Sequence, residues 1–91
     1  MSLLEVIGFV KRGKNRQKVF LSLNKPKIPS EIVKIIYGKA NNTYFNLVSR
    51  ALGELRTKKL IEVVNPQEKT GRIYQRTKFG NEVEKKLREL N

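Results

Sequence analysis

The sequence contains no cysteine and no histidine, and all eight of its acidic residues are glutamates. Without cysteine the chain can form neither a disulfide nor a thiolate metal site. Without histidine it lacks the commonest metal ligand in proteins and the commonest general base. The scattered glutamates suggest no metal cluster and no partner for a nucleophile. We therefore expect a protein that is not an enzyme and that needs neither a metal nor a cofactor.

Long apolar runs are also missing. No stretch reaches the roughly 20 apolar residues that a membrane-spanning helix needs. The first ten residues, MSLLEVIGFV, lack the basic segment and the small-residue cleavage site of a secretion signal. We therefore expect a cytoplasmic protein without a membrane partner. The length of 91 residues suits one domain, and association of two copies would add to its small core.

Positive charge dominates the composition. Twenty lysines and arginines face eight glutamates, which gives a formal net charge of +12 at pH 7. The segment KRGKNRQK, residues 11–18, contains five basic residues and no acidic one. Such an excess attracts polyanions, either nucleic acids or anionic membranes. A surface adapted for solubility or heat would explain many of these charges, but the size of the surplus favours a nucleic acid.

The N-terminal third predicts two short helices. Ser2 and Glu5 match a capping box at the start of a helix over residues 2–10, although the β-branched residues there would also suit a strand. This apolar segment either packs within one molecule or forms a dimer surface. A second, amphipathic helix is expected over residues 14–23. The two prolines of residues 24–29 prevent its continuation.

The next two helices are joined by a short turn. Pro29 suits the first position of a helix that ends near Gly38. The residues expected to be buried on this helix are Ile32, Ile35 and Ile36. Asn41 or Asn42 can cap the following helix, which is expected over residues 42–58. A short helix, a turn with glycine and a longer helix are the layout of a helix-turn-helix.

The helix expected over residues 42–58 has two different faces. Its apolar face comprises Phe45, Val48, Leu52 and Leu55. A second face at the same spacing comprises Asn46, Ser49, Arg50 and Gly53. A solvated helix face usually carries glutamate and lysine, whereas this one carries short hydrogen-bonding side chains, one arginine and a glycine. The composition of this second face indicates a binding surface.

A β-hairpin and a final helix are expected in the rest of the chain. Residues 60–64 and 72–77 have strand character and flank a polar turn at residues 65–71. Thr77 can cap a helix over residues 78–90. The apolar residues of that helix are Phe79, Val83, Leu87 and Leu90. Its acidic and basic residues alternate, so we do not expect this helix to face a nucleic acid.

The order of these elements, together with several local motifs, resembles archaeal winged-helix transcription regulators of the broad MarR/ArsR kind. The parts that carry the resemblance are Pro29–Ile32 at the start of the first motif helix, Val48–Leu52 in the recognition helix, Leu60–Val64 before the wing, and Tyr74, Thr77 and Gly80 before the last helix. The similarity spans residues 14–85. Two positions depart from the pattern: Ile28 replaces the frequent Ser or Thr cap, and Lys59 replaces the usual glycine before the wing.

The resemblance implies an α+β, mostly helical fold, the winged helix-turn-helix. It has a three-helix core, a two-stranded wing, a C-terminal helix and, here, a short N-terminal apolar segment. It further implies one DNA-binding domain over residues 1–91, sequence-specific binding of double-stranded DNA, and a homodimer with residues 2–10 and 78–90 as candidate dimerisation elements. It implies no particular operator, target gene or small-molecule effector.

The recognition helix of such a protein enters the major groove, where arginine pairs with guanine and asparagine with adenine. The candidates for contact with bases are Asn42, Thr43, Tyr44, Asn46, Ser49 and Arg50. Other roles stay open, because Asn42 can cap the helix, Tyr44 can pack in the core and Arg50 can pair with Glu54. Gly53 would be explained by the close approach of a DNA backbone or of another helix, or by drift on a tolerant surface.

A second set of residues is expected to contact the sugar-phosphate backbone or the minor groove. These candidates are Lys14, Arg16, Lys18 and Lys39, and, in the wing over residues 65–77, Lys69, Arg72 and Arg76. Contacts of this kind add affinity and salt dependence without reading the sequence. A solvated surface charge is the alternative for each single lysine.

Two other functions compete with DNA binding. Winged helices also bind RNA, and Tyr44 or Tyr74 could stack on a base, although the chain has no GXXG loop and no aromatic strand signature of an RNA-recognition motif. A winged helix can also serve as a protein-interaction module, with the positive charge providing solubility. Competition between duplex DNA and RNA, and binding at low salt, distinguish these possibilities.

Overall fold

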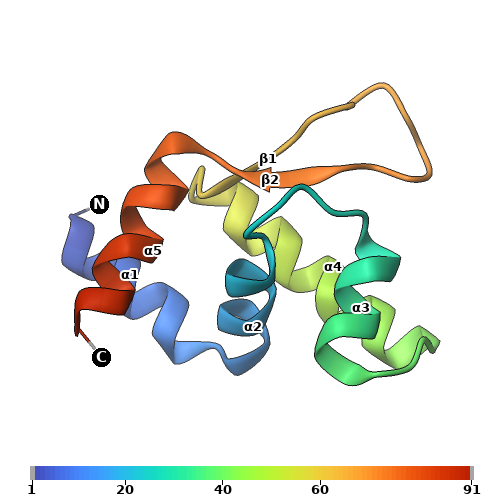
Figure 1. Ribbon diagram of the computed structural model, residues 1–91, viewed down its shortest axis with the longest axis horizontal. Helices are drawn as coiled ribbons and strands as arrows, with labels where there is room; N and C mark the ends of the chain where they lie inside the picture. The colour runs from blue at the N-terminus through green and yellow to red at the C-terminus, as the bar shows by residue number, and fades with distance from the viewer. Residues whose placement is uncertain (1, 91) are drawn as a thin grey trace.

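The computed structural model describes residues 2–90, which form five helices and one two-stranded antiparallel sheet (Figure 1). In chain order these are α1 (Leu3–Arg12), α2 (Lys14–Ser22), α3 (Pro29–Tyr37), α4 (Asn42–Thr57), β1 (Ile61–Val63), β2 (Tyr74–Arg76) and α5 (Lys78–Leu90). The fold is therefore α+β and mostly helical, which confirms the class predicted from the sequence.

Local hydrogen bonds explain where the first and third helices begin. The Ser2 hydroxyl accepts from the backbone N–H of Glu5 at 3.2 Å, and the Ser2 N–H donates to the Glu5 carboxylate. These bonds lower the pKa of Glu5. They form a capping box, so the segment for which the sequence allowed a helix or a strand is a helix. Ile28 offers no side-chain acceptor to α3. There the Glu31 carboxylate accepts from the Ile28 N–H at 3.1 Å, and Pro29 occupies the first helical position.

The end of α4 depends on an unusual backbone conformation at Lys59, whose φ is +60°. The Lys59 N–H donates to the carbonyl of Arg56 at 2.9 Å, and the Leu60 N–H donates to the carbonyl of Leu55 at 3.0 Å. This pair of bonds is a Schellman motif, in which the left-handed position normally holds glycine. Lys59, which stands where the resemblance leads one to expect glycine, therefore has the left-handed backbone conformation that glycine adopts most easily.

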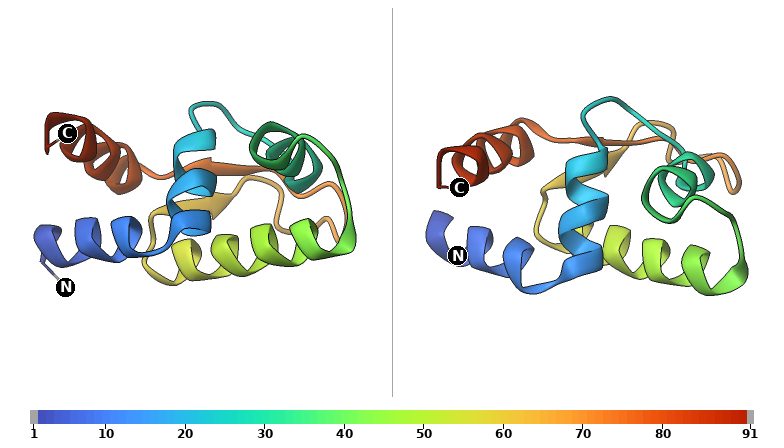
Figure 2. Two further views of the ribbon diagram at one scale, coloured as in Figure 1. Left: turned by 90° about the horizontal axis from the view of Figure 1, so that it is seen from below. Right: turned by 60° about the horizontal axis from the view of Figure 1, so that its bottom comes forward.

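Helix α2 lies at the centre of the molecule and packs against α1, α3 and α4 (Figure 2). Helices α1 and α5 lie side by side, and the start of α1 and the end of α5 are at the same end of the molecule. The largest fully buried side chains come from every part of the chain: Phe20, Ile32, Leu55, Leu60, Val10, Val19, Val33, Val48 and Val83. One core therefore joins all five helices to the sheet.

One apolar residue expected in this core is outside it. Ile35 is 59 % exposed, and Leu90, one of the apolar residues of the last helix, is 58 % exposed. Helix α3 buries Ile32 and Val33 against α2 and α4, which turns Ile35 toward solvent. Leu90 is the last residue of α5 and lies beyond the reach of the core. The expected burial of Ile35 was wrong, because spacing along a helix does not say how wide the covering neighbours are.

The hairpin has shorter strands than its sequence suggested. Its paired residues are Ile61 with Arg76, Glu62 with Gln75, and Val63 with Tyr74. Backbone bonds between Lys27 and Tyr74 tie the α2–α3 loop to the far side of β2. Asn65 closes the ladder, because its side chain accepts from the N–H of Ile73 at 2.7 Å and donates to the carbonyl of Gly71 at 3.2 Å. The tip beyond Asn65 is thus a loop rather than paired strand.

Thr77 fastens the last helix to the rest of the fold. Its hydroxyl accepts from the N–H of Gly80 at 2.9 Å, which confirms its role as the cap of α5. The same hydroxyl donates to the carbonyl of Lys59 at 2.7 Å, and the Thr77 N–H donates to the carbonyl of Leu60 at 3.0 Å. One residue therefore holds together the end of α4, the sheet and the start of α5.

Candidate nucleic-acid interface

Helix α4 has the two faces that its sequence predicts. Its buried residues are Val48, Ala51, Leu52 and Leu55. On the opposite side, six residues between Asn42 and Gly53 are exposed to solvent: Asn42, Thr43, Asn46, Ser49, Arg50 and Gly53. Five of the six candidates for base contact thus share one exposed surface, which we call the polar face of α4 and define by these six residues.

Asn41, and not Asn42, caps this helix. The Asn41 side chain accepts from the backbone N–H of Tyr44 at 2.9 Å. Asn42 stands in the first turn with an exposed side chain that capping does not require. The first turn contains no acidic residue, so the positive end of the helix dipole is not neutralised from within the helix. The N-terminal end of the polar face is consequently suited to an anionic or hydrogen-bond-accepting partner.

Tyr44 is placed differently from the other candidates for base contact. Its ring stacks on that of Tyr37, with centroids 4.3 Å apart and planes inclined by 2°. The Tyr37 hydroxyl donates to the side-chain oxygen of Asn15 on α2, and burial, followed by the proximity of Tyr44, raises the pKa of Tyr37. These contacts join α2, α3 and α4. The geometry thus favours the alternative role of Tyr44, packing between helices.

Arg50 does not pair with Glu54, although the two are four residues apart. Glu54 instead accepts from Arg16 of α2, with an Nη2–Oε2 distance of 3.1 Å. Among residues 2–90, Arg50 has no ion pair and no side-chain hydrogen bond. Arg16, by contrast, is only 16 % exposed, so its expected contact with phosphate is not available in this arrangement.

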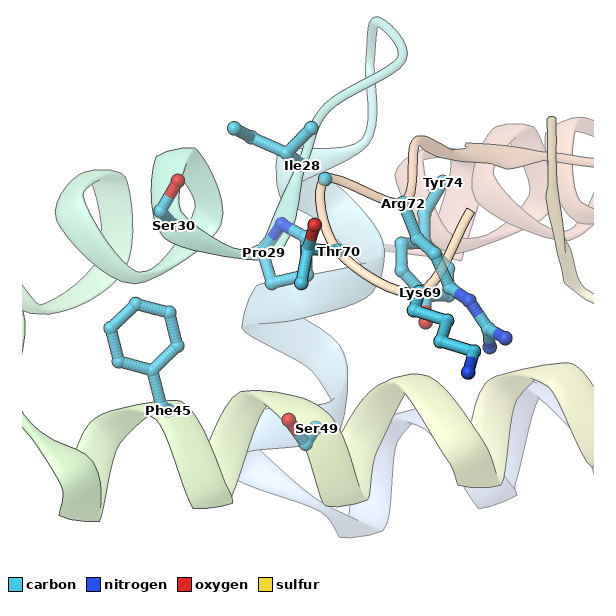
Figure 3. A pocket seen from close by; sticks show the side chains of 10 residues that line it. Ile28, Pro29, Ser30, Phe45, Ser49, Lys69, Thr70, Arg72 and Tyr74 are labelled. Atoms are coloured by element: carbon cyan, nitrogen blue, oxygen red, sulfur yellow. The ribbon is translucent and has the colours of Figure 1, made fainter. Parts of the chain in front are cut away.

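A hollow of about 510 Å³ separates α4 from the hairpin (Figure 3). Its lining residues are Ile28, Pro29, Ser30, Phe45, Ser49, Lys69, Thr70, Gly71, Arg72 and Tyr74. In Figure 3 the side chains of Lys69 and Arg72 extend from the hairpin toward α4. The lining includes two cations and four hydroxyl-bearing residues but no carboxylate. This hollow is therefore a basic groove beside Ser49 of the polar face.

Ser30 and Thr70 line this groove but were not anticipated as site residues. Neither lies in a sequence motif that indicates a ligand. Ser30 is in the first turn of α3 and Thr70 is at the tip of the hairpin, 40 residues further along the chain. They reach the same groove only because the hairpin folds back over α3 and α4. No local signal in the sequence would have found them.

The remaining cations divide into two groups. Lys14, Lys18 and Lys39 are exposed, and Lys14 lines a smaller hollow of about 170 Å³ that also includes Arg50. Arg76 lies elsewhere: its guanidinium is 5.5 Å from the ring of Phe20, and its Nε is buried without a partner. Burial lowers the pKa of Arg76. Arg76 therefore does not line the groove with Lys69 and Arg72, the other residues of the hairpin that the sequence suggested as contacts to a DNA backbone or minor groove.

Gly53 has open space around it, since a Cβ atom there would have no neighbour within 4 Å. Within residues 2–90, no other helix approaches this position. One of the explanations considered for the glycine, close packing by another helix of the chain, is thereby removed. An approach by a partner and drift on a tolerant surface are the explanations left.

No helix within residues 2–90 combines the length and the apolar character that crossing a membrane requires. No protein-family model, no curated protein and no solved structure matches the chain. The side chains of α4, of the groove and of the hairpin are therefore the features that point to a function.

Proposed function

We propose that the protein binds double-stranded DNA in a sequence-specific manner, as a small transcription regulator with a winged helix-turn-helix fold. The observation that carries the proposal is the polar face of α4. It presents amides, hydroxyls and an unpaired arginine to solvent, with basic side chains on both sides. In this arrangement α3 and α4 are the two motif helices, and the hairpin of β1 and β2 is the wing.

The polar face has the chemistry that reading a major groove requires. Arginine can donate two hydrogen bonds to guanine O6 and N7, and asparagine can bond both N6 and N7 of adenine. Arg50, Asn46 and Asn42 lie on one exposed side of α4, and Asn42 and Thr43 stand at its N-terminal end. That end of a recognition helix enters the groove most deeply. We propose these residues, with Ser49, as the base-reading set.

The groove between α4 and the hairpin suits a phosphate of the DNA backbone. Lys69 and Arg72 supply positive charge, and the hydroxyls of Ser30 and Ser49 can donate hydrogen bonds. On the other side of α4, Lys14 lies beside Arg50, and Lys18 and Lys39 are exposed. Cations on both sides of the helix would follow the two strands that border a major groove. Each phosphate contact contributes about 0.9 to the salt slope of binding.

A homodimer is part of the proposal. Leu3, Leu4 and Leu90 are exposed, the first two at the start of α1 and the last at the end of α5. A second copy that packs on α1 and α5 would cover these leucines and would leave α4 and the hairpin free. Two copies would then present two polar faces to successive turns of one duplex.

Fluorescence anisotropy tests the proposal directly. The chain is titrated into a random duplex of about 25 base pairs and into the corresponding double-stranded and single-stranded RNA, at several salt concentrations. We expect tight binding to duplex DNA that weakens steeply as salt rises. Selection from random sequence would then recover a preferred site. A clear preference for RNA, or no binding at low salt, would show that the polar face serves another partner, RNA in the first case and a protein in the second.

A further inference from the structure

We propose that Arg16 is a positioning residue that keeps Arg50 available for DNA by holding the carboxylate of Glu54. This inference rests on the proposed function, because the role of Arg16 is defined by what Arg50 binds. Arg16 would act without touching DNA itself. It would influence the affinity and the base preference of the polar face indirectly, through its contact with the Glu54 carboxylate.

The contact between Arg16 and Glu54 is bidentate. Nη2 of Arg16 donates to Oε2 at 3.1 Å, and Nε donates to Oε1 at 3.4 Å. Parallel bonds of this kind fix the orientation of a carboxylate as well as its position. The Glu54 side chain is 39 % exposed, against 16 % for Arg16. The carboxylate therefore lies at the surface, whereas the guanidinium that holds it lies beneath.

Arg16 is itself held in place by α1. Its Nη1 donates to the carbonyl of Phe9, and its guanidinium carbon lies 3.8 Å from the centroid of the Phe9 ring. The backbone leaves room for this side chain at Gly13, where a Cβ atom would lie 3.0 Å from Cβ and 3.1 Å from Cζ of Arg16. The break between α1 and α2 thus allows Arg16 to fold back onto both α1 and α4.

Glu54 is the residue of α4 that could form an ion pair with Arg50 and so make Arg50 unavailable to DNA. It is the only acidic residue in the sequence of α4, and it follows Arg50 by one helical turn. In an isolated helix, oppositely charged side chains at this spacing pair with each other. Here Arg50 and Glu54 border the same small hollow, yet the carboxylate bonds to Arg16 and Arg50 has no partner within residues 2–90. The same pairing also neutralises the one negative charge on α4 that would repel phosphates.

Substitution of Arg16 by methionine tests this inference by rescue. Methionine keeps much of the apolar volume but releases Glu54, which can then pair with Arg50. We expect R16M to weaken binding to the preferred duplex about twofold, which is what an ion pair at this spacing can withhold, and to reduce its preference over random duplex. The double variant R16M/E54Q should recover the preference, because a neutral glutamine does not capture Arg50. E54Q alone should bind at least as tightly as the wild type.

Arg88→Met is the matched control. Arg88 pairs with Glu84 on α5 at 2.7 Å, so R88M also removes one positive charge and releases one glutamate, but away from α4. We expect R88M to leave the preference for the selected duplex unchanged. If R16M and R88M lose the same affinity, or if E54Q fails to restore the preference, the loss reflects charge or stability alone and the inference is wrong.

Thermal unfolding and NMR separate the inference from its alternatives. R16M should unfold at a lower temperature, and E54Q should restore selectivity without restoring that stability. The Arg50 side-chain Nε–Hε resonance should shift in R16M and return in the double variant, in the absence of DNA. A wild-type chain that binds no duplex would refute the proposed function, whereas wild-type binding with an unmoved Arg50 resonance in R16M would refute only the role of Arg16.

Discussion

Gly80 lies directly against the carbonyl group of Leu60. A Cβ atom at Gly80 would overlap the carbonyl oxygen and would lie 3.0 Å from the carbonyl carbon. The same oxygen accepts the N–H of Thr77 at 3.0 Å. The first turn of α5 can therefore sit on the junction between α4 and β1 only if residue 80 has no side chain. This contact explains a glycine three residues after the capping threonine.

Gly80→Ala should destabilise the protein by about 2–4 kcal/mol, because the overlap is with backbone that cannot move without breaking the bonds of Thr77. Urea unfolding followed by circular dichroism measures the change. Gly53→Ala is the matched control, since a Cβ there meets no atom within 4 Å. It should stabilise α4 by about 1 kcal/mol. Similar changes in both variants would contradict the contact between Gly80 and Leu60.

Lys59→Gly should stabilise the protein. The φ of +60° costs a lysine about 1–2 kcal/mol, and glycine at this position removes that cost. The greater conformational freedom of glycine in the unfolded chain offsets part of the resulting stabilisation. We expect a net increase of about 0.5–1 kcal/mol in the free energy of unfolding. Lys58→Gly, at a position with φ of −90°, should lower that free energy instead. A stabilising effect at both positions would argue against relief of backbone strain.

Arg50→Ala should cost about 1–3 kcal/mol of binding free energy on the selected duplex and relax the preference for one base pair. The reason is the loss of a bidentate contact in the major groove. Anisotropy on a panel of single-base variants of the site measures both effects. Arg88→Ala removes the same charge from α5 and should change neither. An equal loss on random DNA would make Arg50 a phosphate contact.

Arg72→Ala should weaken binding to all duplexes alike and reduce the salt slope by about one. Arg72 lines the groove beside α4, and its Nε donates to the carbonyl of Glu68 at 2.7 Å. Arg76→Ala offers the comparison within the same hairpin. Because the Arg76 guanidinium lies over Phe20, its loss should alter stability and leave the slope unchanged. An unchanged slope for Arg72→Ala would remove the hairpin from the interface.

Leu4→Glu should disrupt the proposed dimer. Leu4 is 75 % exposed in the first turn of α1, which packs against α5, and a buried carboxylate there would be unpaired. Sedimentation equilibrium should report a dimer for the wild type and a monomer for the variant. Ile35→Glu, at a residue of α3 that is 59 % exposed, should remain dimeric. A monomeric wild type would exclude the homodimer.

Most of the fold could be predicted from the sequence because its signals are local. Ser2 with Glu5, Pro29, Gly38 and Thr77 mark the ends of helices through bonds within one turn. The alternation of apolar and polar residues in α4 indicated which side would be buried. The exposure of Ile35 was not predicted, because burial depends on the extent of neighbouring elements and not only on periodicity.

The candidate site was only partly predictable. The sequence by itself determined the charge of +12, the lack of cysteine, histidine and aspartate, and the composition of the polar face. Only the tertiary structure decided which cations are free: Arg16 is bound to Glu54, Arg76 lies over Phe20, and Arg50 has no partner within residues 2–90. The physical reason is that an ion pair or a cation–π contact depends on a few ångströms between elements distant in sequence, which local patterns do not encode.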